Sequence, residues 1–171
     1  MKTKRRYFGK YRGSVINNLD PLKIGRLMVQ VADVGGLVPG TWAMPCFPFS
    51  GKQMGAWMIP QVNAGVWVEF EQGDPNYPIW CGCFFGAVAE VPVLALAGPE
   101  ISPNVVLQTA AQNAVIISDT PGPTGGIMLK SATGVTLLVN DTGIYLQNGK
   151  GAMITLAGPS VTINNGALAI T

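Results

Sequence analysis

Two carboxylates in this sequence have a spacing that could serve acid–base chemistry. Glu69 and Glu71 are two positions apart in a run that alternates apolar and polar residues, so in a strand both side chains would lie on one face, about 7 Å apart. Such a pair could act as the acid and the base of glycoside cleavage. No other feature indicates a sugar site, and outward acids at alternate positions are ordinary on a half-exposed strand. We therefore predict no catalytic residue.

The absence of histidine and the spacing of the cysteines limit the catalytic mechanisms and metal sites that the chain could have. The 171 residues include no histidine, which excludes Ser-His-Asp and Cys-His catalysis and histidine-ligated metal sites. Cys46, Cys81 and Cys83 have no Cys-x-x-Cys spacing, and zinc would need a fourth ligand from elsewhere. We expect buried free thiols, with Cys81 and Cys83 on the same face of one strand. The prediction is a non-enzyme without metal or cofactor.

A basic and aromatic arm at residues 1–11 is the next candidate site. Interleaved positive and aromatic side chains could contact single-stranded nucleic acid beside an OB-type barrel. The rest of the barrel sequence offers no comparable positive charge, which disfavours a nucleic-acid groove. A solvated arm without a partner is a further alternative. We favour docking onto an acidic neighbouring protein, through Arg5, Arg6, Tyr7, Phe8 and Tyr11.

The composition requires β-structure and a covered surface. Hydrophobic residues make up 48% of the chain and charged residues 12%, while glycine and proline number 22 and 13. So many helix-breaking residues exclude a mostly helical fold, and the high apolar content with a net charge of +2 disfavours disorder. No apolar run is long enough to span a membrane, and we expect no export signal. The low charge indicates a surface covered by other copies of the chain.

The first half has the pattern of a five-stranded, OB-type barrel at residues 12–87. Alternating apolar residues and intervening turn residues predict strands at 12–16, 25–31, 42–46, 65–71 and 78–84. In the fourth strand we expect Val66, Val68 and Phe70 to point inward. Closure into a barrel would remove the exposed sheet edges.

The second half, after an extended linker at 88–100, is a series of short strands at 101–171. Six segments of about eight residues, spanning 125–171, each begin at a small or turn-forming residue and carry alternating aliphatic positions. We expect one continuous apolar stripe, made of Ile127, Leu129, Val135, Leu137, Val139, Ile144, Leu146, Ala152, Ile154, Leu156, Val161, Ile163, Leu168 and Ile170.

A stripe of this kind needs a second layer to cover it. One chain could coil on itself as a monomeric β-helix, or three chains could interleave with their stripes pointing at a common axis. The trimer is favoured, because 50–70 residues make few coils for a monomeric core. We predict an all-β fold: an N-terminal OB-fold barrel followed by an intertwined trimeric β-helix, or β-prism, that forms a needle.

Three segments of the chain resemble a known family. Residues 18–31, with Asp20-Pro21, Gly25-Arg26 and alternating valines, look like the opening of the OB-fold of contractile-tail spikes. Residues 65–78, with Gly73-Asp74-Pro75 and then Pro78, resemble a second stretch of that OB-fold, and 149–168 is similar to its trimeric needle. The family includes phage baseplate assembly protein V, the T4-type tail-lysozyme hub and the Vgr spikes of type VI secretion.

The resemblance implies a structural homotrimer that forms the central spike of a contractile injection machine in a virion tail baseplate, assembled in the bacterial cytoplasm. It would dock to hub and tube proteins, carry the push of contraction and pierce the target membrane, which it contacts only transiently. The chain has neither an inserted lysozyme domain nor a His-x-His metal motif. We expect its end to be a platform for a separate PAAR-like tip protein, formed by Leu168, Ile170 and Thr171. The alternative is a nucleic-acid-binding OB module with a β-rich extension.

Two further predictions concern surface contacts. Residues 47–58 are apolar but lack strand alternation. Exposed, they would form a sticky patch, so we expect them to pack on a neighbouring subunit or hub protein. The tryptophans could form a ligand platform, but such residues more often fill cores or subunit contacts. We favour the latter for Trp42, Trp57, Trp67 and Trp80.

Overall fold

The protein is an all-β chain that divides into two compact units, and the boundary along the chain lies between Val88 and Ala89. The structure is a computed structural model that describes residues 5–170, with the backbone alone for residues 36–40 and residue 169. Within the described residues, no helix is long and apolar enough to cross a membrane. The elements of these residues are strands and short 3-10 turns, which confirms the expected all-β class.

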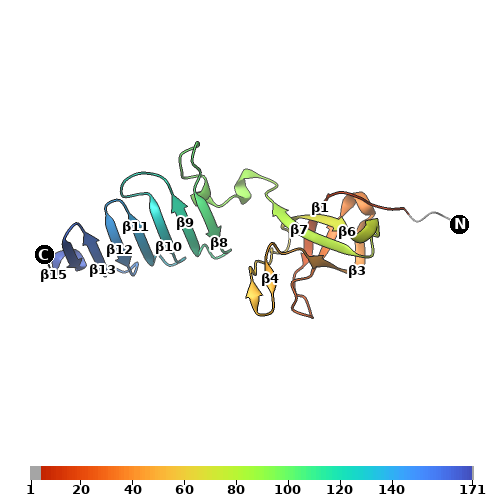
Figure 1. Ribbon diagram of the computed structural model, residues 1–171, viewed down its shortest axis with the longest axis horizontal. Helices are drawn as coiled ribbons and strands as arrows, with labels where there is room; N and C mark the ends of the chain where they lie inside the picture. Colours follow the sequence, from red (N-terminus) through yellow and green to blue (C-terminus); the bar gives the residue numbers. More distant parts are fainter. Residues whose placement is uncertain (1–4, 171) are drawn as a thin grey trace. The chain divides into compact units, whose positions relative to one another are not determined.

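The first unit is a closed barrel with the strand order β1-β2-β3-β7-β6 (Figure 1). Neighbouring strands are antiparallel, except that β3 and β7 run parallel. The elements are β1 (Tyr11–Asn17), β2 (Leu27–Val31), η1 (Ala32–Val34), β3 (Gly36–Pro45), β6 (Gly65–Phe70), η2 (Glu71–Gly73) and β7 (Pro78–Phe84), where η denotes a 3-10 turn. The expected OB-type barrel is present.

Alternate residues of the strands fill the barrel interior. On β6, Val66 and Val68 are fully buried and Phe70 nearly so, while the residues between them are half-buried. On β2 the same alternation buries the first, third and fifth residues. The core comprises Val15, Leu27, Val29, Val31, Val34, Ala43, Val66, Val68, Phe70 and Trp80. The alternation of apolar residues in the sequence thus correctly predicts which residues of β2 and β6 point inward.

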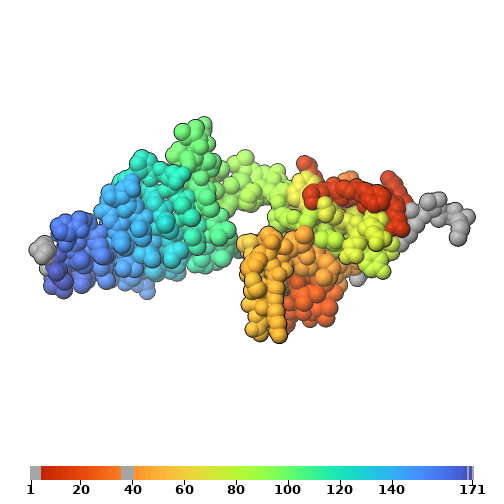
Figure 2. All heavy atoms as spheres, viewed as in Figure 1, coloured from red at the N-terminus to blue at the C-terminus, as the bar shows by residue number. Residues whose placement is uncertain are grey.

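Residues 47–58 contain a small hairpin rather than an irregular loop. β4 (Ser50–Gly51) pairs with β5 (Met54–Gly55), and the segment projects from the barrel as an orange ridge in Figure 2. Phe47 at its base packs against the barrel core, with its ring centre 5.5 Å from that of Trp80. Strands of two residues are too short for alternation to be visible in the sequence.

The second unit is one antiparallel sheet whose eight strands follow each other in space as they do in the sequence (Figure 1). They are β8 (Val105–Gln108), β9 (Ala114–Ser118), β10 (Gly126–Lys130), β11 (Thr136–Asn140), β12 (Gly143–Gln147), β13 (Met153–Ala157), β14 (Ser160–Ile163) and β15 (Leu168–Ile170). The turns η3 (Val88–Glu90) and η4 (Val93–Ala95) precede the sheet, and η5 (Asn164–Gly166) precedes β15.

Backbone pairing in this sheet differs from the expected intertwining, because each strand hydrogen-bonds to its neighbours in the same chain. The turns explain this. The Asn140 side-chain oxygen accepts hydrogen bonds from the N–H groups of Thr142 and Gly143, at 2.9 and 3.2 Å. Asn148 does the same for Lys150 and Ala152. Such asparagine-stabilised turns fold the chain back at once, so consecutive strands pair directly.

Candidate functional site

The principal candidate site is an apolar face of the second unit. In the sheet register, aliphatic residues lie directly opposite one another on every successive pair of strands, which places them on one face. One column is Val105, Ile117, Ile127, Val139, Ile144, Leu156, Val161 and Ile170. The second is Leu107, Val115, Leu129, Leu137, Leu146, Ile154, Ile163 and Leu168. We call these two columns the aliphatic face.

Most side chains of the aliphatic face are exposed in the single chain. Their exposed fractions range from 36% at Leu156 to 61% at Leu107 and Ile170, and only four members are half-buried. Isolated exposed aliphatic residues are normal, but a contiguous patch of this extent marks a surface that another molecule covers. A single sheet also needs a second layer to form a core. The face is therefore an interaction surface.

The structure brings together nearly all the residues expected in the stripe. Val135 and Ala152 are exceptions, because they lie in the turns just before β11 and β13 and not in the paired strands. Sequence reasoning missed β8 and β9 and their four face residues. The signal was hidden because residues of the other face, such as Val106 and Ile116, are also apolar here, so the runs do not alternate. Thr171, expected beside Leu168 and Ile170, lies outside the described residues.

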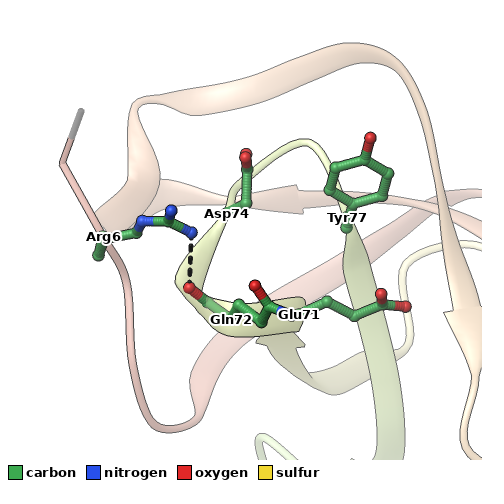
Figure 3. Close-up of a pocket in the computed structure, with 5 residues that line it drawn as sticks. All are labelled: Arg6, Glu71, Gln72, Asp74 and Tyr77. Carbon is green, nitrogen blue, oxygen red and sulfur yellow. Dashed lines mark hydrogen bonds between the residues drawn. The ribbon is translucent and has the colours of Figure 1, made fainter.

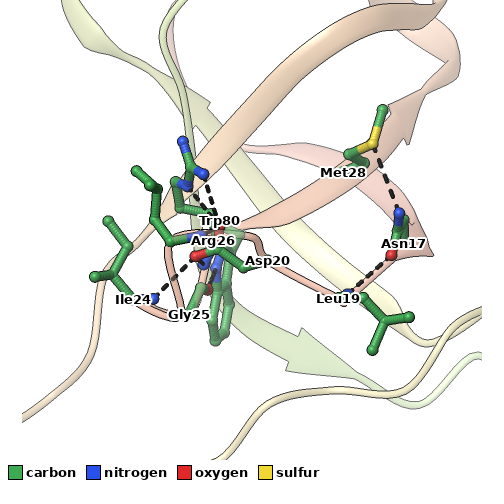
Figure 4. Close-up of polar contacts among 9 residues, drawn as sticks. Asn17, Leu19, Asp20, Ile24, Gly25, Arg26, Met28 and Trp80 are labelled. Carbon is green, nitrogen blue, oxygen red and sulfur yellow. Dashed lines mark hydrogen bonds and ion pairs between the residues drawn. The ribbon is translucent and has the colours of Figure 1, made fainter.

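The Asp20-Pro21…Gly25-Arg26 motif forms a tightly bonded loop in the first unit (Figure 4). The Asp20 carboxylate accepts hydrogen bonds from the backbone N–H groups of Leu22, Ile24 and Arg26 and pairs with the Arg26 guanidinium at 2.7 Å. The pairing with Arg26, aided by the backbone donors, holds the pKa of Asp20 well below its usual range. Trp80 Nε1 donates to the Gly25 carbonyl at 3.0 Å. The motif fixes loop structure.

The N-terminal arm, from Arg5 onward, lies against the barrel. The Tyr7 N–H donates to the Gly73 carbonyl at 2.9 Å, and Arg6 donates to the Gln72 carbonyl at 2.8 Å. The Tyr7 and Tyr11 rings pack on Phe70, with ring centres 6.0 and 5.6 Å away, whereas Phe8 is 71% exposed. Arg6, Tyr7 and Tyr11, which were expected to dock a partner, therefore also make contacts within the chain.

The acidic pair does not form on one strand. Glu69 lies on β6 and pairs with Lys10 at 2.7 Å, while Glu71 begins η2, where the strand has ended. Glu71 lines an open pocket of about 220 Å³ together with Arg6, Gln72, Asp74 and Tyr77 (Figure 3). The expectation that both residues belong to one strand is wrong, because β6 ends at Phe70 and Glu71 is the first residue of η2.

The cysteines are free, as expected, but they are not buried. Cys46 and Cys83 are exposed and Cys81 is half-buried, because β7 turns Trp80 inward and leaves Cys81 and Cys83 outside the core. Partial desolvation by neighbouring protein atoms nevertheless raises the pKa of the Cys83 thiol. Among the described residues, no group of three acidic, cysteine or histidine side chains is placed to hold a metal ion.

Comparisons with known families recognise both the barrel and the sheet. Residues 11–85 match the type VI secretion system/phage-baseplate injector OB domain, and residues 104–169 match the phage baseplate V C-terminal trimerisation domain. No curated protein matches the chain. The chain belongs to the phage baseplate V family of injector spike proteins, whose members are structural baseplate components.

Proposed function

We propose that three copies of this chain join their aliphatic faces around one axis and form the shaft of a spike. The supporting observation is the unbroken register of the two aliphatic columns across all eight strands, together with their exposure. The match to a trimerisation domain supports three copies. In this proposal Val135, from the turn before β11, joins a trimer core made by strand residues. The strand residues are Ile127, Leu129, Leu137, Val139, Ile144, Leu146, Ile154, Leu156, Val161 and Ile163.

The proposed role of the shaft is mechanical. Each interior strand already satisfies its backbone hydrogen bonds within its own chain, so joining the faces adds a packed core without leaving polar groups unpaired. A closely packed core resists compression. The trimer would carry the push of a contracting tail and pierce the target envelope, while it touches the membrane only briefly. Catalysis has no part in this role.

Docking surfaces are proposed at three places. The hairpin at 47–58 exposes Phe49, Met54, Trp57 and Met58, each by more than half, which suits packing on a hub or tube protein. The arm residues Arg5, Arg6, Tyr7, Phe8 and Tyr11 would form a second docking surface, to which the two arginines contribute positive charge. At the other end of the chain, Leu168 and Ile170 are 53% and 61% exposed. With Thr171 they would form the platform for a separate PAAR-like tip protein.

The proposed location is a phage tail baseplate, or a related injector, after assembly in the bacterial cytoplasm. The decisive first experiment is light scattering on the purified full chain during size-exclusion chromatography. We expect about three times the chain mass of 18.0 kDa. A folded protein with the mass of one chain would contradict the proposal. Retention of single-stranded DNA in a salt-dependent manner would instead favour the nucleic-acid alternative.

A further inference from the structure

The segment that leads into the sheet carries a second set of uncovered apolar side chains. Val93, Leu96 and Ile101 are 80%, 58% and 97% exposed. These values are mostly higher than those of the aliphatic face itself, where the maximum is 61%. The sequence had indicated an extended linker at 88–100.

The segment is folded instead of extended. Residues 93–95 form η4, with backbone hydrogen bonds from Ala95 to Pro92 and from Leu96 to Val93 at 2.8 and 3.1 Å. A further turn joins the N–H of Ser102 to the Pro99 carbonyl at 3.1 Å. Three exposed apolar side chains on a folded backbone indicate a contact surface, because grouped exposed apolar residues mark places that another molecule covers.

Two side chains tether this segment to the first strands of the sheet. Asn104 Nδ2 donates to the Leu94 carbonyl at 2.8 Å, and Ser102 Oγ donates to Asp119, which follows β9, at 2.6 Å. β8 is the edge strand of the sheet, and its face residues Val105 and Leu107 are among the most exposed of the aliphatic face. The apolar segment is thus fixed beside the least covered end of that face.

We propose that Val93, Leu96 and Ile101 form a clasp that packs on a second copy of this chain, against the β8 end of its aliphatic face. This inference rests on the proposed trimer and adds a contact outside the matched trimerisation domain, which begins at residue 104. A sister chain is the occupant because η4 of the clasp adjoins strand β8, whose aliphatic residues belong to the surface proposed to trimerise. Assembly of the sheets brings three tethered clasps to one axis at high effective concentration.

Charge also fits a sister chain. The only ionisable residues from 89 to 104 are Glu90 and Glu100, so the segment has no positive charge to attract an anionic membrane or nucleic acid. The apolar side chains of Val93, Leu96 and Ile101 are complementary to the aliphatic residues of β8.

The test places the photo-crosslinking amino acid p-benzoylphenylalanine at position 101 of the full chain. After illumination we expect covalent dimers and trimers on a denaturing gel, with the crosslink in residues 93–108 of another copy. The matched control carries the same probe at position 155, because Thr155 pairs with Tyr145 on the face opposite the aliphatic columns, and it should remain monomeric on the gel.

Light scattering on the same samples separates the two possible failures. A trimer that gives no crosslink from position 101 would overturn the clasp and leave the proposed trimer intact. A sample with the mass of one chain would overturn both. As a second readout, Ile101→Ser should raise the concentration at which half of the trimers dissociate by about tenfold or more, since a buried side chain of this size is lost. An unchanged midpoint would also contradict the clasp.

Discussion

Leu146 on β12 lies directly opposite Ile154 on β13 in the sheet register. Their exposed fractions are 42% and 38% in the single chain, although aliphatic side chains of this size are typical of protein cores. The pair belongs to a column that continues to Leu137 and Ile163 on either side. Its cover must come from outside the chain, which makes the middle of the column the most sensitive place for assembly.

Ile154→Asp should abolish trimer formation. In the proposed trimer the substitution puts three carboxylates at one level of the core, and an unpaired buried charge costs several kcal/mol, on the order of 3–5 per site. The measurement is the solution mass by light scattering. Thr155→Asp is the matched control, because the adjacent side chain points to the other face, and this variant should keep the wild-type mass. A normal trimer of Ile154→Asp would contradict the inward assignment.

Gly126→Ala should destabilise the sheet much more than Gly151→Ala. Both glycines have positive φ, 92° and 98°, so each substitution places an L-residue in a left-handed conformation at a cost of about 1–2 kcal/mol. At Gly126 a Cβ would also overlap the Val139 carbonyl oxygen on the next strand, whereas nothing lies within 4 Å of a Cβ at Gly151. The free energy of unfolding in urea measures the difference. Equal losses would show that the backbones can move apart.

The sequence predicted the inward and outward residues well wherever one face of a strand was apolar and the other was not. On β6 the alternation from Gly65 to Phe70 identified the three inward side chains. In the second unit it identified most of the aliphatic face. The prediction failed at β8 and β9. There Val106 and Ile116 make the other face apolar as well, so the sequence does not alternate between apolar and polar residues.

Other features depended on contacts that no local pattern encodes. Two of the residues that Tyr7 contacts, Gly73 and Phe70, are more than 60 positions away, so the arm could not be distinguished from a solvated tail. Strand β6 ends at Phe70, so Glu71 lies outside it, and the next residue, Gln72, adopts a positive φ of 50° within η2. A glutamine gives no sequence signal for that conformation, since glycine or asparagine is the residue usually expected there.

Asp20→Asn should lower the melting temperature of the protein, and the difference from wild type should shrink in acid. Because folding depresses the pKa of Asp20, its carboxylate stabilises the fold above the unfolded-state pKa of about 4. That contribution is lost as the pH falls through the lower folded-state value. Melting curves of both proteins at pH 7, 4 and 2.5 provide the measurement. Asp33→Asn, at an exposed residue of η1, serves as control. A difference that persists or grows in acid would refute this role.

Trp80→Phe should cost about 1–3 kcal/mol of unfolding free energy, because it leaves the Gly25 carbonyl without its indole donor. Trp80 is 4% exposed, so water cannot easily replace the lost bond. Trp67→Phe is the comparison: Trp67 is only half-buried and lies against Phe84, with ring centres 5.0 Å apart. In urea denaturation, Trp80→Phe should lose more free energy of unfolding than Trp67→Phe. Equal losses would argue against a stabilising hydrogen bond from the Trp80 indole to the Gly25 carbonyl.

Lys10 should react slowly with amine-acylating reagents because it holds its proton. Its hydrogen bonds to Glu69 and to Cys81 raise the pKa of Lys10 to about 12, so any stabilisation by the ammonium is present below about pH 10.4 and is lost as the pH rises through about 12. At pH 9.5, Glu69→Gln should therefore speed the labelling of Lys10 by about tenfold. Mass spectrometry of the labelled peptides measures this, with Lys150 in the second unit as internal control. If Lys10 labels at the same rate in both proteins, the ion pair does not hold the proton in solution.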